Sequence, residues 1–147
     1  MRYLKEDEFN LASRFLFLSM AITVLEQDMK HFANGAFKIK EPYLDFIEKL
    51  LVKAKKERRE LRKSMHERKI RVSRLSQNES FSSYMFISGR KEEQRNYFNP
   101  AIRKQVEAIM RELILPGAVP TSQKSVADLA GVYQANSENE PFAAPDS

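Results

Sequence analysis

The 147-residue sequence contains no cysteine. Within these residues, disulfide bonds, thiolate metal sites and a cysteine nucleophile are therefore excluded. Glycine is also scarce, and the four glycines stand far apart in the chain. Loops that hold phosphate groups need several glycines close together, so a nucleotide-binding loop of that kind is not expected. The lack of cysteine is compatible with a reducing compartment, and we predict a cytoplasmic location.

Long hydrophobic runs are also missing. The most apolar segment, FLFLSMAITVL (Phe15 to Leu25), has 11 residues between Arg14 and Glu26. A helix needs about 20 apolar residues to cross a bilayer. The residues before it are largely acidic (Glu6, Asp7 and Glu8), whereas a signal peptide begins with cations. We therefore predict a helix buried in protein, and no membrane partner.

Patterns typical of catalysis or metal binding are absent from the sequence. Its two histidines, His31 and His66, have no second ligand at the spacing of a metal site. The serines lack the G-x-S-x-G pattern of a nucleophile elbow. The sequence therefore predicts a protein that is not an enzyme and holds no metal or cofactor.

Helical periodicity covers the first third of the chain. Apolar residues at steps of three and four predict a helix from Asp7 to Asn34. In its middle the helix is apolar on nearly every side, which is typical of a central core helix or of a dimer interface.

A second helix is predicted to begin at Glu41-Pro42, since proline fits the first turn of a helix. Alternating steps of three and four then run from Leu44 to Leu75, which is the pattern of a coiled coil. Arg58 and Arg68 occupy two core positions of this pattern. The predicted partner interface consists of apolar members of the seam: Leu44, Ile47, Leu51, Leu61, Met65 and Val72.

The remaining segments are less regular. Phe81–Ser88 fits a helical face and a strand almost equally, with a slight preference for the strand. Asn99-Pro100 predicts a third helix, with Asn99 as its cap, which ends at Pro116-Gly117. Residues 116–147 have the composition of a disordered tail, in which residues 126–133 form a candidate docking helix.

These patterns predict a mainly α fold with a domain at 1–115 and a flexible tail at 116–147. The domain would be a small helical bundle with one long, basic, coiled-coil-like helix and a short element that is either strand or helix. The number of phenylalanines and the apolar seam favour a homodimer in which two chains share a core.

Positive charge is concentrated in one part of the chain. The net charge is +5, but residues 49–74 carry twelve Lys and Arg against three Glu, a net +9. On a helix, most of these cations form one stripe beside the apolar seam. The residues of this stripe that we predict to contact nucleic acid are Lys55, Lys56, Arg59, Arg62, Lys63 and Lys69. Three occupants fit such a stripe: solvent, the phosphates of a nucleic acid, and an acidic protein or the protein's own acidic tail.

The sequence therefore predicts a small, basic, non-enzymatic accessory protein. The first functional hypothesis is a nucleic-acid-associated regulator that contacts DNA or RNA phosphates without reading bases. The alternative is a protein-interaction adaptor that docks a partner helix on the coiled-coil seam or on residues 126–133.

Overall fold

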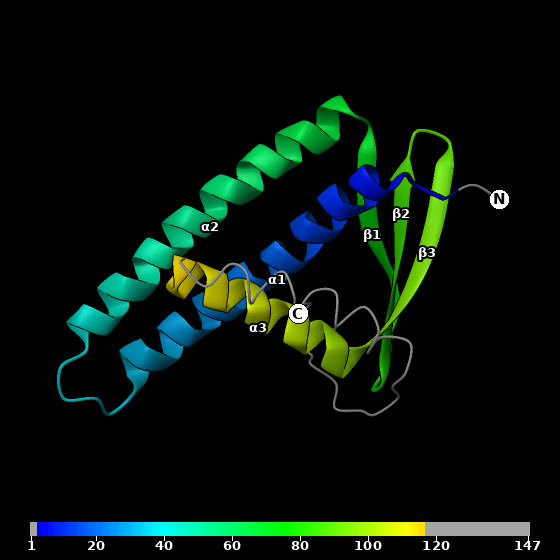
Figure 1. Cartoon of the computed structure of the whole chain (residues 1–147). Helices are drawn as coiled ribbons and strands as arrows, with labels where there is room; N and C mark the ends of the chain where they lie inside the picture. The colour runs from blue at the N-terminus through cyan, green and yellow to red at the C-terminus, as the bar shows by residue number, and fades with distance from the viewer. Residues whose placement is uncertain (1–2, 117–147) are drawn as a thin grey trace.

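The computed structural model describes residues 3–116 of the chain. They form three helices and a three-stranded antiparallel sheet with the strand order β1-β2-β3 (Figure 1). The fold is therefore α+β, and the prediction of a mainly α bundle is wrong. The elements are, in chain order, α1 (Glu6–Asn34), α2 (Glu41–Glu67), β1 (Ile70–Gln77), β2 (Phe81–Ser88), β3 (Lys91–Phe98) and α3 (Asn99–Ile114).

Helices α1 and α2 form a hairpin in which α2 runs back along α1 (Figure 1). The apolar seam of α2 lies in this contact, where Ile47, Leu51 and Ala54 are buried. The apolar spacing of α2 suggested a coiled coil between two chains, but in the structure these residues pack against α1 of the same chain. A helix that packs along a hairpin partner needs an apolar stripe at the same spacing, so the pattern alone did not separate the two cases.

The second helix ends at Glu67, eight residues before the predicted end at Leu75. Lys69 has a φ of 58°, in the left-handed region, and turns the chain out of the helix. From Ile70 to Ser73 apolar and polar residues alternate, which is the period of a strand, and Ile70 and Val72 are β-branched. Hydrogen bonding to β2 stabilises these residues as a strand, so they do not continue the helix.

Strands β2 and β3 form a hairpin joined by Gly89 and Arg90, and Gly89 has a φ of 62°. Residues Phe81–Ser88 form a strand, which was the slightly preferred of the two predictions. Every second residue of this strand is buried: Ser82, Tyr84, Phe86 and Ser88. β3 was not predicted, because KEEQRNYF carries no apolar alternation until its last two residues. Its pairing with β2 supplies the stabilisation that its own composition lacks.

The core lies between the helices and the inner face of the sheet. Phe86 of β2 is fully buried, and its ring centroid lies 4.7 Å from that of Phe9 on α1. Phe17 of α1 meets Tyr97 of β3 edge-on, with ring centroids 5.5 Å apart. These aromatic contacts fix α1 across the sheet, so α1 is the central helix that the sequence predicted, but it is covered partly by strands.

Asn99 does not have the capping role predicted for it. It is the first residue of α3 and is fully buried, and Phe98 takes the cap position without a side-chain hydrogen bond. Ser82 Oγ donates to Asn99 Oδ1 at 2.7 Å, and Asn99 Nδ2 donates to the carbonyls of Asn78 and Glu79. The side chain thus ties the β1–β2 loop to β2 and to the start of α3.

Within the described residues, α1 is the one helix long and apolar enough to cross a bilayer, judged by length and composition alone. In this fold α1 packs against α2, α3 and the sheet. The predicted tail lies outside the described residues apart from Pro116, as does the candidate docking segment at 126–133.

Candidate nucleic-acid interface

The predicted cationic stripe lies mainly on one side of α2. Its five α2 members are all exposed: Lys55, Lys56, Arg59, Arg62 and Lys63. Lys69, also exposed, lies in the turn between α2 and β1 and not on a helix. The acid Glu57 faces away from the stripe, where it accepts hydrogen bonds from Arg14 at 2.8 and 3.1 Å. Lys55 pairs with Glu26 at 3.0 Å, whereas Lys56, Arg59 and Lys63 make no ion pair within residues 3–116.

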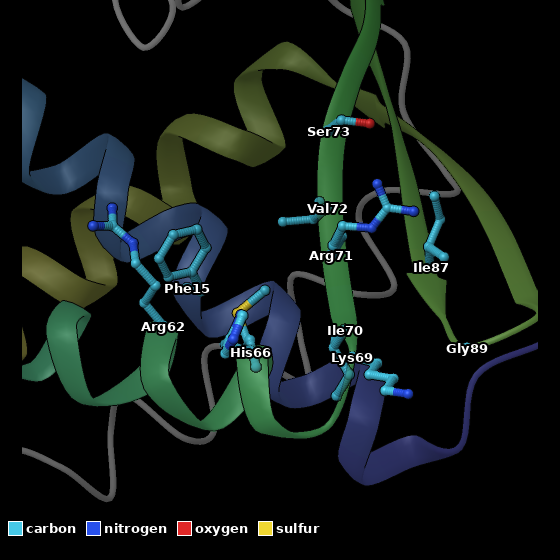
Figure 2. A pocket seen from close by; sticks show the side chains of 11 residues that line it. Phe15, Arg62, His66, Lys69, Ile70, Arg71, Val72, Ser73, Ile87 and Gly89 are labelled. Carbon is cyan, nitrogen blue, oxygen red and sulfur yellow. The ribbon is translucent and has the colours of Figure 1, made fainter.

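A hollow of about 730 Å³ lies where the end of α2 meets β1 (Figure 2). Its apolar lining comes from α1, α2, β1 and β2: Phe15, Met65, Ile70, Val72 and Ile87. Its exposed rim carries Arg62, His66, Lys69 and Arg71. Arg71 and Val72 point to opposite sides of β1, so the hollow extends across this strand (Figure 2). The hollow therefore combines an apolar floor with a cationic rim, and Phe15, Ile87 and Arg71 are contributions that the sequence did not predict.

A second hollow of about 360 Å³ continues the first along β1 and shares Val72 and Ser73 with it. It is lined on the helical side by Leu16, Ser19, Met20 and Thr23 of α1 and Arg58 of α2, and on the sheet side by Arg74 and Tyr84. The two hollows together are called the edge groove below. Among the described residues that line it, every charged side chain is a cation.

The groove runs beside the outer edge of β1. The amide of Gly89 donates to the carbonyl of Lys69 at 3.2 Å, so these two residues form a hydrogen-bonded pair. In an antiparallel ladder, hydrogen-bonded pairs alternate with pairs that are not hydrogen-bonded. Arg71 and Ile87 are therefore the next hydrogen-bonded pair. Ile70 and Val72 therefore direct their backbone N–H and C=O groups away from β2, toward the groove.

Charge segregation gives the groove its electrostatic character. Arg62 lies over the ring of Phe15, with its Cζ atom 5.6 Å from the ring centroid, and this cation–π contact places the guanidinium at the mouth of the hollow. Cations from α2, the turn and β1 therefore surround one groove, and none of the lining residues that the structure describes is an acid. An anionic ligand would relieve the repulsion between these cations.

The residues predicted as a partner interface are mostly used within the monomer. Ile47, Leu51 and Met65 are buried in the core, and Leu44 and Leu61 are half-buried. Val72 is half-buried on β1, where it lines both hollows. A second copy of the chain stays a prediction, but the greater part of this seam is already covered.

An ionic cluster away from the groove joins α1 to the β2–β3 hairpin. Glu8 accepts hydrogen bonds from Lys91 Nζ at 2.8 Å, the Lys5 amide at 2.9 Å and Ser88 Oγ at 2.9 Å. These hydrogen bonds lower the pKa of Glu8 from 4.5 to about 2, and the bond from Lys91 has the largest effect on this pKa. All three partners favour the charged carboxylate, so the cluster stabilises the fold and offers no general acid or base at neutral pH.

This cluster gives a pH-dependent prediction. Because the pKa of Glu8 is lower in the folded chain, its contribution to stability is complete above about pH 4.5 and is lost as the pH falls toward 2. Glu8→Gln is expected to lower the free energy of unfolding by about 1.5 kcal/mol at pH 7, and by much less at pH 2.5. Urea denaturation at both pH values measures the difference.

The matched control for Glu8 is Glu107→Gln. Glu107 pairs with Arg111 at 2.7 Å, but both side chains are more than half exposed. This substitution should lower the free energy of unfolding by less than about 0.5 kcal/mol at either pH. Equal costs for the two variants at pH 7 would show that Glu8 does not join α1 to the hairpin.

The described residues contain no group of three His, Asp or Glu side chains placed to hold a metal ion. His31 and His66 are both exposed and lie on different helices. The absence of an enzymatic activity stays a prediction.

The fold and the groove define a small α+β protein in which a helical hairpin packs on a three-stranded sheet and leaves a basic edge strand exposed. The YhjD protein family matches residues 3–116, and the chain belongs to this family. Over 110 residues it is 37% identical to uncharacterized protein YhjD of Bacillus subtilis (strain 168), covering 75% of this chain and 92% of that protein. No solved structure matches the chain significantly.

Proposed function

We propose that this protein binds nucleic acid through the phosphate backbone, using the edge groove and the cationic side of α2. The observation that carries the proposal is the single sign of charge around one groove. Arg58 and Arg62 stand on the helical wall, and Arg71 and Arg74 stand on the strand wall. Cations from separate elements are thus gathered where one polyanion would contact them together.

Counterion release supplies the driving force. Each phosphate that a Lys or Arg neutralises sets free a counterion condensed on the nucleic acid, so the observed affinity falls steeply as salt is added. Lys56, Arg59 and Lys63, unpaired within residues 3–116, extend the basic surface beyond the groove. Contacts of this kind bind the backbone without reading sequence.

The proposal predicts salt-sensitive binding with little dependence on base sequence. Fluorescence anisotropy of the full chain with labelled 20-nucleotide DNA and RNA, at about 50 and 200 mM salt, measures it. For six or more phosphate contacts we expect the affinity to fall by about 10³-fold between the two salt concentrations. If the folded chain shows no binding at the lower salt concentration, the proposal is wrong.

A second candidate function, protein docking, is favoured by the outer edge of β1. The backbone groups of Ile70 and Val72 face the groove, and within the described residues no strand pairs with this edge. An extended, acidic segment of a partner protein would add to such an edge through main-chain hydrogen bonds. Strand addition depends less on charge than phosphate binding does, so a complex that persists at about 500 mM salt would favour docking over nucleic acid.

A further inference from the structure

We infer that the apolar floor of the edge groove holds an unpaired base, so that the protein prefers single-stranded nucleic acid to duplex. This inference rests on the proposed function and names the substrate class of the same site. It starts from the contrast between the floor and the rim of the larger hollow. Phosphate binding needs cations alone, yet here the cations surround apolar side chains.

The ring of Phe15 is the central element of this site. Phe15 is half-buried on α1 and lines the hollow, while Arg62 of α2 lies over its ring (Figure 2). An aromatic ring next to an arginine matches the two parts of a nucleotide, because the base stacks on the ring and the phosphate pairs with the cation. Val72 closes the strand side of the hollow as a second apolar surface.

A duplex does not use these groups. Its bases are stacked inside the helix, and extruding one costs unstacking and unpairing energy. It would contact the rim residues Lys69 and Arg71 through phosphates and leave the apolar floor hydrated. A single strand brings unpaired base faces to the floor and phosphates to the rim at the same time, so it gains from both.

The floor also indicates how the base is held. Among the described residues that line the larger hollow, Ser73 and the imidazole of His66 are the hydrogen-bonding side chains besides the cations Arg62, Lys69 and Arg71, and the others are apolar or, at Gly89, have no side chain. A floor of this composition stacks on any base and distinguishes little between them. The preference is therefore for strandedness, and not for sequence.

Three labelled probes of one length test this in anisotropy titrations with the full chain: a mixed-sequence single strand, its duplex, and a single strand of abasic sites. The abasic strand keeps every phosphate and lacks every base. The expected result is about tenfold tighter binding to the single strand than to either other probe. This comparison uses the unaltered protein, so it does not depend on whether any variant folds.

Substitutions at Phe15 then locate the base. Phe15→Leu should reduce the affinity for the single strand to that for the abasic strand and leave duplex binding unchanged. The chain has no tryptophan, so Phe15→Trp places a unique fluorophore in the hollow while keeping an aromatic ring. Its emission should be quenched by the single strand and unchanged by the abasic strand. Phe46→Trp, at an exposed position near the start of α2, is the control and should not respond.

The outcomes separate the inference from the proposed function. Equal affinity for all three probes, with steep salt dependence, overturns the inference and leaves phosphate binding in place. No binding of any probe at low salt overturns both. Quenching of the Phe15→Trp protein by poly-glutamate, as strong as by the single strand, also overturns the inference, because the hollow would then accept an acidic polypeptide.

Discussion

A variant with K56E, R59E and K63E is expected to lose nucleic-acid binding by at least about 100-fold at low salt. These three cations are exposed on α2 and make no ion pair within residues 3–116, so reversing their charge disturbs no contact that the structure shows. The variant removes three phosphate contacts and adds three repulsive charges. The salt dependence should weaken as well, by about 2 in the slope of log K against log salt for a single strand.

The matched control changes the net charge by the same amount elsewhere. K30E, K38E and K104E reverse exposed lysines on α1, on the α1–α2 loop and on α3, away from the edge groove. This variant should keep most of the affinity, because screening limits the reach of a surface charge to about 10 Å at 0.1 M salt. Anisotropy titrations of both variants measure the effect. An equal loss in both would mean that net charge alone, and not the α2–β1 surface, determines binding.

The largest stability effect is expected at Phe86. Its side chain is fully buried between the sheet and α1, where it contacts Phe9, so Phe86→Ala leaves a cavity in the core. Such changes cost about 3–5 kcal/mol, which is a large part of the stability of a domain of this size. The midpoint of thermal unfolding should fall by about 15 °C or more. Circular dichroism melts and urea titrations measure the loss.

Phe46→Ala is the control for this loss, since it makes the same chemical change on the exposed side of α2, where Phe46 is 46% exposed. It should alter the free energy of unfolding by less than about 0.5 kcal/mol. Similar melting temperatures for the two variants would contradict the placement of the core between α1 and the inner face of the sheet.

The segment around Glu67 shows where local pattern is insufficient. The heptad spacing of α2 continues without a break from Met65 through Val72 to Leu75, and it predicted one helix. Residues Ile70 to Ser73 also alternate with a period of two, and β2 supplies the pairing partner that makes the strand the stable structure here. A partner strand that lies later in the chain is invisible to a local window, so the sheet and the groove were both missed.

The helices show the opposite case. The helix predicted from Asp7 to Asn34 is confirmed within one residue, and the third helix begins at Asn99, which was predicted to be its cap. Long apolar periods and proline in the first turn act within a few residues, so they are present in the sequence itself. β3 lacks such a signal, because its composition is polar and its position depends on the hairpin turn at Gly89.

By itself, the sequence determined the concentration of positive charge in residues 49–74, its stripe on one side of α2, the central apolar helix and the lack of cysteine chemistry. Only the tertiary structure decided what the stripe faces. Packing of α1 against α2 buries the seam that suggested a second chain, and the turn at Lys69 folds β1 back so that β1 lines one hollow together with Phe15 and Arg62. The physical reason is range: charge and helical period are local properties, whereas a groove needs residues from four elements brought together by pairing and burial.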